Sequence, residues 1–501
     1  MKRTVRLNSA DNVVTAFKRL EAGAEHDGVR VSQTIPRGHK LATHPIAKGN
    51  PVLKYAQIIG FARQNIAAGD HVHTHNLEFR NTRQKYEFGT DLHPVDIVSS
   101  PDTFLGFKRK SGRAGTRNYI AVITSVNCSA TAARMIAGHF TPQMLTVFPN
   151  VDGVVAFAHG TGCGMAGDGD GFEALQRVMW GYAKHPNVAG VLMVGLGCEM
   201  MQIDWLLEAY GITPGPLFQA MNIQDVAGLR KTIELGIRKV GAMLPLADEA
   251  TRTPCPVSDL TVALQCGGSD AWSGITANPA LGHACDLLVA QGGTGVLAET
   301  PEIYGAEHLL TRRAATRDIG EKLVDMIKWW EDYTARNHGT MDNNPSPGNK
   351  KGGLTTILEK SLGAAAKGGT TPLNGVYKYA EPILARGFTF MDSPGYDPAS
   401  VTGQIAGGCT LVAFTTGRGS AFGSKPSPTI KIATNTNMYD RMKEDMDLDA
   451  GTILSADETV ESIGLQIYQM FLDVASGRPT KSELQGLGDF EFVPWQIGAV
   501  M

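Results

Sequence analysis

The sequence has no long apolar run, no excess of basic residues and few cysteines for its length. No apolar stretch reaches the length of a membrane-spanning helix, so we expect no membrane partner. The 46 basic and 49 acidic residues give a net charge of −3 without a basic stripe, which argues against a nucleic-acid partner. The opening residues MKRTVRLNSADNVV lack the apolar core of a secretory signal, so we expect a cytoplasmic protein.

The seven cysteines are odd in number and widely spaced, and no CxxC pair occurs. In a cytoplasmic protein this pattern predicts free thiols or metal ligands rather than a disulfide framework. A glycine-rich dinucleotide fingerprint with its downstream acidic residue is also missing, as is a phosphate-binding P-loop. We therefore predict no nucleotide cofactor, and these absences argue against a nicotinamide dehydrogenase.

What the chain does have is a change of pattern along its length, and 501 residues are enough for two or three domains. Residues 1–85 contain short β-rich runs broken by glycines, and residues 5–20 predict a strand, a turn and a helix capped near Asp11 or Asn12. Residues 86–104 predict a linker. Two α/β domains follow, over residues 105–252 and 253–501, because apolar runs then alternate with helical stretches, which is typical of parallel sheets covered on both faces.

The expected strands and helices of the two α/β domains follow from these runs. The expected strands lie within residues 118–126, 151–160, 188–197, 260–268, 286–299, 387–394, 411–419 and 429–435. The clearest expected helices lie within residues 172–184 and 321–336.

Three histidines alternate with other residues in GDHVHTHN. On a strand, His71, His73 and His75 would share one face. Imidazole suits divalent iron, manganese or zinc, so we predict metal ligands here. His39, in GHK, is a candidate fourth ligand or acid–base group, and its neighbour Lys40 is a second catalytic candidate. The alternative is a polar edge strand with solvated histidines.

Three equally spaced cysteines each follow an apolar run: Cys128, Cys163 and Cys198. Loops at the carboxyl ends of parallel strands converge, so the three thiols could meet. Three thiolates could hold an iron–sulfur cluster with one open iron, which is the rival to a histidine metal site. Small thiols that pack as buried apolar groups are the alternative. His159, in HGTGCG, is a further catalytic candidate.

Glycine-rich loops follow strands at residues 265–274, 290–295 and 414–420. Glycine lets the backbone approach an anion, and the next helix presents its amides to it. Arg418 can bind a carboxylate through two hydrogen bonds. We therefore assign substrate binding to Arg418, Thr416, Ser269 and Asp270. An ordinary strand–turn–helix connection is the alternative for each loop.

The segment NNPSPGNKKGG, at residues 343–353, predicts a long loop of polar residues. We assign substrate binding to its Asn344 and Ser346. Lys350 is a candidate carboxylate clamp or, if desolvated, a base. A solvated turn is the alternative.

These motifs resemble the altronate and galactarate dehydratase family over nearly the whole chain. GHK, KYAQIIGFA and GDHVHTHN resemble its SAF-like N-terminal domain, and HGTGCG, GLGCE, CGGSDAWSGITANPALG, NPSPGNKKGG and FTTGRGS resemble its larger catalytic part. The resemblance implies an α/β protein with a small β-rich SAF-like domain followed by two flavodoxin- or Rossmann-like parallel-sheet domains that bind no dinucleotide.

The resemblance also implies a reaction, the loss of water from a sugar acid to give a 2-keto-3-deoxy acid, assisted by iron(II) or manganese(II). The expected substrate is an altronate-like aldonate or a galactarate-like aldarate. A sulfo-lyase acting on sulfolactate and a non-catalytic sugar-acid-binding protein are the alternatives. We expect a homodimer, because twofold assemblies are the commonest oligomers.

Overall fold

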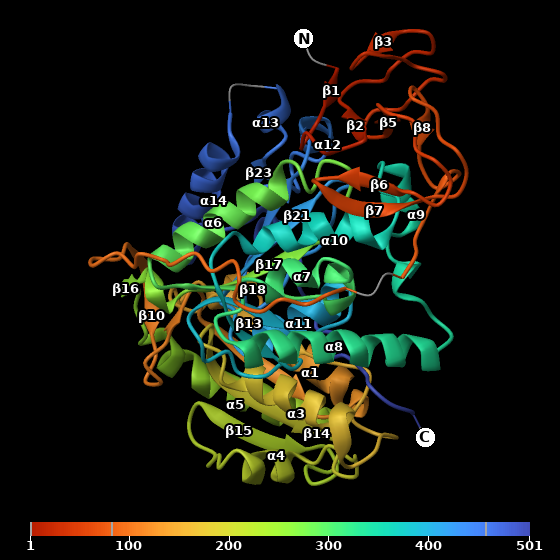
Figure 1. Ribbon diagram of the computed structural model, residues 1–501. Helices are drawn as coiled ribbons and strands as arrows, with labels where there is room; N and C mark the ends of the chain where they lie inside the picture. Colours follow the sequence, from red (N-terminus) through yellow and green to blue (C-terminus); the bar gives the residue numbers. More distant parts are fainter. Residues whose placement is uncertain (1–2, 82–83, 456–457, 501) are drawn as a thin grey trace.

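The computed structural model describes residues 3–81, 84–455 and 458–500. Figure 1 shows a small β domain, coloured red to orange, that lies at the top of a larger α/β body. The lower part of that body is formed by the second domain, coloured yellow, and the remainder by the C-terminal domain, coloured green to blue. The predicted fold class, a β-rich SAF-like domain followed by parallel-sheet α/β domains, is confirmed.

The N-terminal domain contains only short antiparallel strands. A four-stranded sheet has the order β1-β2-β5-β8, a three-stranded sheet the order β6-β7-β9, and a hairpin joins β3 and β4. The strands are β1 (Thr4–Val5), β2 (Val13–Ala16), β3 (Glu25–His26), β4 (Val29–Arg30), β5 (Lys40–Ala42), β6 (Pro51–Lys54), β7 (Gln57–Ala62), β8 (His71–Val72) and β9 (Leu77–Glu78).

The helix predicted after Asp11 is wrong, because residues 13–16 form strand β2 instead. All four of these residues are buried, and β2 pairs with β1 on one side and β5 on the other. The Asp11 carboxylate accepts backbone hydrogen bonds from Asn8 at 3.0 Å and from Ala56 at 2.8 Å. Asp11 therefore closes a turn and holds a neighbouring loop rather than capping a helix.

The second domain is a parallel sheet of order β13-β12-β14-β15 with helices on both faces. The three strands predicted here are confirmed, while β15 was not predicted. The strands are β12 (Tyr119–Thr124), β13 (Gly153–Phe157), β14 (Val188–Gly195) and β15 (Phe218–Asn222). The helices are α1 (Ala130–His139), α2 (Pro142–Leu145), α3 (Gly169–Ala183), α4 (Ile203–Ala209) and α5 (Leu229–Asp248).

The C-terminal domain has a seven-stranded parallel sheet of order β19-β20-β18-β17-β21-β22-β23. Its strands are β17 (Thr261–Cys266), β18 (Thr294–Leu297), β19 (Leu373–Tyr377), β20 (Gly387–Met391), β21 (Leu411–Thr416), β22 (Thr429–Ala433) and β23 (Leu448–Asp449). Its helices are α6 (Ala277–Ala290), α7 (Glu307–Thr311), α8 (Arg317–Arg336), α9 (Pro347–Lys351), α10 (Ile357–Ala365), α11 (Asp397–Gly407), α12 (Thr436–Arg441), α13 (Thr452–Ser455), α14 (Val460–Ala475) and α15 (Lys481–Leu484).

One predicted strand of this sheet is shorter than expected. Residues 286–290 complete helix α6, a turn follows at residues 291–293, and strand β18 begins at Thr294. The run LLVA within this segment is apolar because α6 is largely buried, and the sequence pattern cannot distinguish a buried helix from a buried strand.

A small antiparallel sheet joins the two α/β domains. It is formed by β10 (Thr103–Lys108), β11 (Ala114–Gly115) and β16 (Thr253–Pro256). Residues 84–102 contain no helix or strand and run along the C-terminal domain, where the Val98 amide donates to the Ala290 carbonyl at 2.9 Å.

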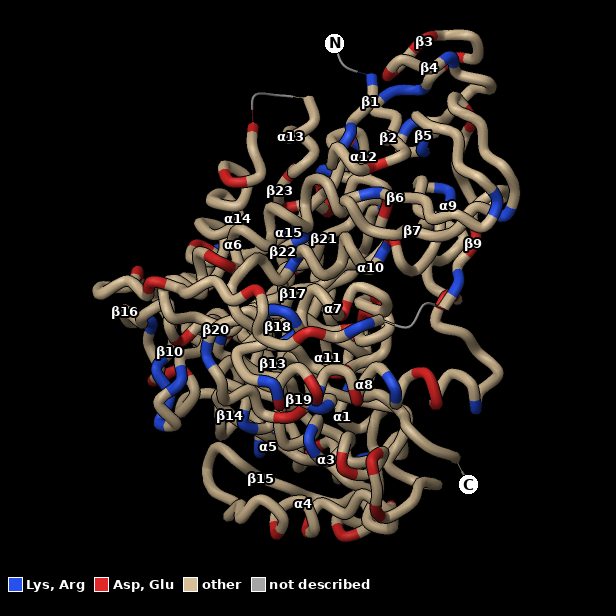
Figure 2. Tube along the Cα trace, in the orientation of Figure 1, with Lys and Arg blue, Asp and Glu red and all other residues tan. Residues whose placement is uncertain are grey.

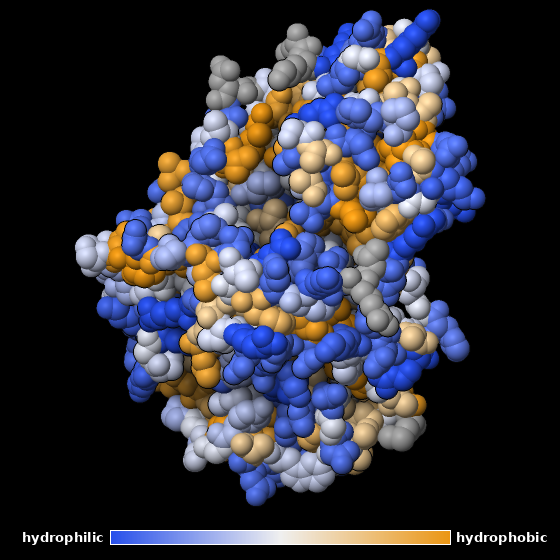
Figure 3. Space-filling model, viewed as in Figure 1, coloured by the Kyte–Doolittle hydropathy of each residue, from blue (hydrophilic) through white to orange (hydrophobic). Residues whose placement is uncertain are grey.

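Hydrophilic residues cover most of the face shown in Figure 3, with small apolar patches between them. Within the described residues, no helix combines the length and the apolar character that crossing a membrane would require.

Helices α3 and α11 bring the second and C-terminal domains into close contact. At Gly181 of α3, a Cβ atom would lie 2.3 Å from the Ala406 carbonyl oxygen of α11. At Gly241 of α5, the same atom would meet nothing within 4 Å.

We therefore predict opposite effects for two glycine-to-alanine substitutions in helices. Gly241→Ala raises the free energy of unfolding by up to about 1 kcal/mol, because alanine is the better helix former. Gly181→Ala lowers it by about 1–3 kcal/mol, because the added methyl overpacks the domain contact. Urea denaturation measures both, and an equal gain for the two variants would contradict the close contact.

Candidate functional site

The N-terminal domain lies over the carboxyl edge of the C-terminal sheet. Strands β17, β18, β20, β21 and β22 all end at this edge, and helices α9 and α10 lie between it and the N-terminal domain (Figure 1). Ligands of open α/β sheets bind in the crevice outside this edge, so the junction is the first place to look for a site.

A buried ionic network fastens the N-terminal domain to α10. The Lys40 ammonium, on β5, lies 2.8 Å from a Glu359 oxygen and 2.8 Å from the Gly353 carbonyl. The Lys54 ammonium, on β6, lies 3.0 Å from the other Glu359 oxygen. Figure 2 shows basic residues on β5, β6 and α9 at this junction. We call Lys40, Lys54 and Glu359 the docking triad.

The environment of the docking triad keeps Glu359 ionised. The side chains of Lys40 and Glu359 have no exposed surface. Burial alone would raise the pKa of Glu359, but the two ammonium groups outweigh it and hold the pKa below its ordinary value. Burial lowers the pKa of Lys40 to about 8. Lys40, predicted as catalytic, is thus committed to protein partners and positions its neighbour His39.

Two glycines let the backbones of this junction approach each other. Gly353 has φ +102°, and a Cβ atom there would lie 2.4 Å from the Gly38 carbonyl oxygen. Gly38 has φ +83°, and its Cβ would lie 3.3 Å from the Gly352 carbonyl. The turn that carries His39 can therefore lie directly against the end of α9.

Four histidine rings gather at this contact. The ring centroids of His39 and His71 are 5.1 Å apart, those of His39 and His73 4.7 Å, and those of His71 and His75 5.3 Å. The predicted strand ends at Val72, and a turn held by Asn76 follows. The rings converge although His73 and His75 are not on a strand. We call these four residues the histidine cluster.

The ring nitrogens of the histidine cluster face one another and the backbone of α9. His39 Nδ1 lies 3.0 Å from His71 Nε2, and His73 Nε2 donates to the Lys350 carbonyl at 3.0 Å. Burial and the neighbouring imidazoles lower the pKa of His71 to about 3, and burial with Lys40 lowers that of His73 to about 4. These imidazoles are neutral at pH 7, as metal ligands must be.

A cationic cleft of about 310 Å³ adjoins the histidine cluster. Its basic residues come from four segments: Arg37 from the N-terminal domain, Lys351 from α9, Arg418 from the loop after β21, and Arg441 from α12. The Lys351 carbonyl lies 3.5 Å from His39 Nε2, so the cleft and the histidine cluster share a wall. The other lining residues are Asp270, Trp272, Gly352, Gly417, Asn435 and Asn437.

The predicted substrate-binding residues of the glycine-rich loops shape this cleft in different ways. Arg418 and Asp270 line it. Asp270 is buried and accepts hydrogen bonds from Thr434 at 2.9 Å and from Asn435 at 3.1 Å, so it holds two loops together. The Thr416 hydroxyl accepts a hydrogen bond from the Gly419 amide at 3.1 Å, and the Ser269 carbonyl accepts one from α9. Both residues therefore hold the loops in their conformation.

Some of the residues predicted in the loop at 343–353 lie at the site, and others have structural positions. Lys350 and Lys351 lie at the end of α9, beside the histidine cluster and the cleft. Ser346 forms the N-terminal capping box of α9 with Asn349. Asn344 points into the interior, where its amide donates to Glu302 at 2.9 Å.

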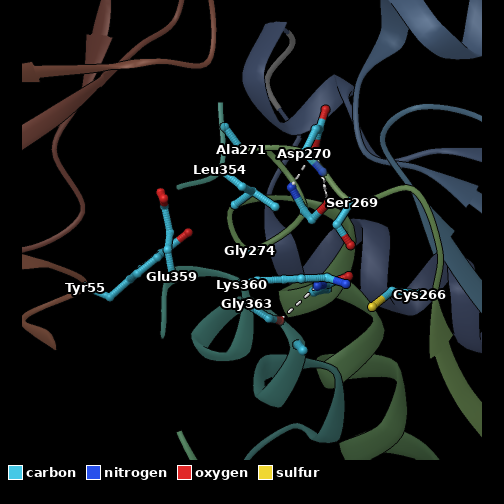
Figure 4. A pocket seen from close by; sticks show the side chains of 13 residues that line it. Tyr55, Cys266, Ser269, Asp270, Ala271, Gly274, Leu354, Glu359, Lys360 and Gly363 are labelled. Carbon is cyan, nitrogen blue, oxygen red and sulfur yellow. Dashed lines mark hydrogen bonds between the residues drawn. The ribbon is translucent and has the colours of Figure 1, made fainter. Parts of the chain in front are cut away.

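A small cavity lies behind the cleft, with room for about one water molecule at 10 Å³. Figure 4 shows Tyr55 reaching towards it from the N-terminal domain, Glu359 and Lys360 from α10, and Ser269 and Asp270 from the loop after β17. Cys266, at the end of β17, lies at its far side.

Beyond Cys266 lies a buried ionic cluster that the sequence did not predict. Donor atoms of Cys266, Glu299 and Glu302 lie within 4.8 Å of one another, and no other metal-ligand group in the described residues is as tight. Lys360 pairs with Glu302, and the Lys367 ammonium lies 2.9 Å from the Cys266 sulfur and 4.0 Å from Glu299. The two ammonium groups supply the positive charge here, so we do not assign a metal ion to this cluster.

Glu299 remains an unusual member of the buried cluster. Both of its carboxylate oxygens are buried without a hydrogen-bond partner. Burial and the nearby Glu302 raise its pKa well above the ordinary value, which favours the neutral acid. In the sequence, these glutamates and lysines have the spacing of ordinary helix-face charges, and nothing in that spacing reveals their burial.

The three predicted cysteines form a separate set in the second domain. Cys128, Cys163 and Cys198 are exposed, so the reading of buried apolar thiols is wrong. Their loops follow β12, β13 and β14 and are joined by backbone hydrogen bonds, including one of 3.1 Å from Met201 to Gly162. The three sulfur atoms do not all lie within 4.8 Å of one another.

The histidines and cysteines do not share a cleft, so the two sets are separate candidate metal sites. In Figure 1, β8 lies at the top of the molecule and α4, which follows Cys198, lies at the bottom. His159 lies with the cysteines in the second domain. Its Nε2 donates to the Thr124 carbonyl at 2.9 Å and its Nδ1 accepts the Thr161 amide at 3.3 Å, so both nitrogens hold local structure.

Family models match nearly the whole chain. They are described as Altronate/galactarate dehydratase SAF domain over residues 2–80, D-galactarate dehydratase/Altronate hydrolase, second domain, over residues 106–248, and D-galactarate/Altronate dehydratase, C-terminal, over residues 257–500.

Individual relatives are similar over most of their length. Altronate dehydratase of Bacillus subtilis is 35% identical over 96% of this chain and 97% of its own length. Galactarate dehydratase (L-threo-forming) of Escherichia coli is 34% identical over 96% and 95%. The (2R)-sulfolactate sulfo-lyase subunit beta of Chromohalobacter salexigens is 34% identical over 78% of this chain and 96% of its own.

We predict that Glu359→Gln lowers the free energy of unfolding by about 3–5 kcal/mol at pH 7, because two buried ammonium groups lose their carboxylate. Glu321→Gln, which breaks the exposed pair with Arg317, is the control and costs less than about 1 kcal/mol. Urea denaturation measures both, and equal effects would contradict the role of the docking triad.

We also predict how the stabilisation by Glu359 depends on pH. The folded-state pKa of Glu359 is depressed, so its stabilisation is complete above the unfolded pKa of about 4.3 and is lost as the pH falls through the lower folded value. The difference in the free energy of unfolding between the native protein and Glu359→Gln should stay constant from pH 7 to 5 and become smaller below pH 4. A gap that widens in acid would contradict the depressed pKa.

Proposed function

The chain belongs to the altronate/galactarate dehydratase family, and we propose that it is a hydro-lyase that dehydrates a sugar acid bound in the cationic cleft. One observation carries the choice of site. The cleft gathers four basic residues beside the four rings of the histidine cluster, at the carboxyl edge of the larger sheet. Basic residues hold a carboxylate, and neutral imidazoles are suited to a metal ion.

Dehydration of a sugar acid has three requirements. The carboxylate at C1 must be held so that negative charge developing beside it is stabilised. A base must take the proton from C2. The hydroxyl on C3 must leave as water, and the resulting enol then becomes the 2-keto-3-deoxy acid.

The first two requirements are met by residues at the junction. Arg37 and Lys351 lie on the wall nearest the histidine cluster and would bind the C1 carboxylate. Lys350, one residue from Lys351, is our candidate for the base, since its side chain makes no hydrogen bond or ion pair among the described residues. Asp270, through Thr434 and Asn435, keeps the loops of the cleft in place.

The third requirement is the basis for a metal ion in the histidine cluster. His39 Nδ1 and His71 Nε2, which lie 3.0 Å apart, would be the first two donors to such an ion. His73 and His75 would supply the further donors once their rings turn towards the ion, since among the described residues no three ring nitrogens of the cluster lie within 4.8 Å of one another. Iron(II), or manganese(II) in its place, would polarise the departing hydroxyl as a Lewis acid.

An iron–sulfur cluster on Cys128, Cys163 and Cys198 is the alternative metal site. The exposure of the three thiols supports it, and their place in the second domain, away from the cationic cleft, argues against it. Release of sulfite from sulfolactate is the alternative reaction, and binding without turnover is the alternative function. We further propose that the enzyme acts in the cytoplasm as a homodimer.

A panel of hexonates and hexarates tests the function directly. The protein, purified without oxygen and supplied with iron(II) or manganese(II), should form a 2-keto-3-deoxy acid from at least one of them. Turnover of sulfolactate alone would establish the sulfo-lyase instead. Binding of sugar acids without product, with metal present, would establish the non-catalytic alternative.

We predict that His71→Ala loses most of the bound iron and lowers kcat at least 100-fold, because a first donor of the ion is removed. Cys163→Ala should keep both iron and activity, and it is the matched control for the other ligand set. Iron content and acid-labile sulfide measure the outcome. Loss of iron and sulfide in Cys163→Ala, with iron retained in His71→Ala, would contradict the histidine site.

A further inference from the structure

The cationic cleft carries more positive charge than one carboxylate needs. Among the residues that the structure describes, four basic side chains line it, and Asp270 is the only acidic lining residue. Burial raises the pKa of Asp270, and its oxygens already accept hydrogen bonds from Thr434, Asn435 and the Trp272 amide. These donors are neutral, so the Asp270 carboxylate offsets one of the four positive charges of the cleft and three remain.

The basic side chains of the cleft have no carboxylate partner of their own. Among the described residues, none of Arg37, Lys351, Arg418 and Arg441 forms an ion pair, although such pairs form elsewhere, for example between Arg117 and Glu483. Arg37 is instead held over the Trp272 ring, 5.4 Å from its centroid. A cleft of 310 Å³ with unpaired cations on its walls matches a small, highly charged anion.

The four cations lie on two walls. Arg37 and Lys351 belong to the segments that contact His39, which is the side of the histidine cluster. Arg418 follows β21 and Arg441 ends α12, so both belong to the carboxyl edge of the C-terminal sheet. A carboxylate bound at the first wall leaves the second wall free for another anionic group.

We propose that the substrate is an aldarate, a sugar acid with a carboxylate at each end. Arg37 and Lys351 bind the carboxylate next to the reacting carbons, and Arg418 and Arg441 bind the distal one, where the two guanidinium groups can each form paired hydrogen bonds. This inference rests on the proposed dehydratase function. It selects between aldonate and aldarate, which the 35% and 34% identities to the two kinds of dehydratase do not.

The distal carboxylate should have a measurable effect. Charge-assisted hydrogen bonds favour an aldarate over the aldonate of equal length and configuration by about 10- to 100-fold in kcat/KM. A phosphorylated aldonate carries similar charge at its distal end, but it is bulkier and not planar. The test therefore compares a hexonate, its 6-phosphate and the hexarate of the same configuration from C2 to C5.

The experiment has a binding arm and a kinetic arm. Calorimetry on the metal-free protein should give at least tenfold tighter binding of the hexarate than of the hexonate. A higher salt concentration should weaken the binding of the hexarate more than that of the hexonate. With metal supplied, kcat/KM should favour the hexarate by a similar factor. Equal values, or a preference for the hexonate or its phosphate, would overturn the proposal and leave the dehydratase function standing. No turnover of any sugar acid would instead overturn that function.

Arg441→Gln tests the distal wall. The ratio of hexarate to hexonate kcat/KM should fall at least fivefold, with a larger change in KM for the hexarate than in kcat. Lys443→Gln removes a nearby exposed charge that does not line the cleft, and it should keep the native ratio. Arg441→Lys, which keeps the charge but loses the planar fork, should be intermediate. An unchanged ratio in an Arg441→Gln variant that keeps the native melting temperature would overturn the assignment of Arg441 to the distal carboxylate.

Discussion

The contact between Glu359 and the two ammonium groups of Lys40 and Lys54 is the constraint on which the site depends. Buried ion pairs add little net stability, but a buried charge without its partner is strongly unfavourable, so the pairing allows few alternative arrangements. It joins β5 and β6 of the N-terminal domain to the start of α10. Since His39 precedes Lys40, the same contact places the histidine cluster against α9.

The C-terminal domain supplies what the N-terminal domain lacks. Its parallel strands bring the loops after β17 and β21 to one edge, and Asp270 ties these loops to the end of β22. The N-terminal domain adds Arg37 and the histidines, and α9 adds Lys350 and Lys351. The N-terminal domain alone has one of the four cations, and the C-terminal domain has none of the four imidazoles. The proposed active site therefore forms only where the N-terminal domain contacts the C-terminal domain. The second domain contacts the C-terminal domain elsewhere, through the packing of α3 against α11.

Much of this organisation could be predicted from the sequence because it depends on local patterns. Buried apolar runs gave the parallel strands, and the rule that their carboxyl ends converge placed Arg418 beside Asp270. The same rule, applied to the three cysteines, could not say that their loops lie away from the histidines. The second and C-terminal domains have separate sheets, so their loops meet at separate edges, and the N-terminal domain docks on only one of them.

The remaining features depend on contacts between distant segments. Lys54 and Glu359 are 305 residues apart, and nothing in either neighbourhood marks them as partners. Arg37 and Arg441 resemble ordinary surface charges until the two domains meet.

The most direct measurement is anomalous diffraction from crystals soaked with manganese(II) or iron(II) and a hexarate. We predict a metal peak between His39 and His71, with the acid in the cleft between Lys351 and Arg441. A metal peak at Cys128, Cys163 and Cys198 with the acid beside it in the second domain would contradict a site assembled by docking.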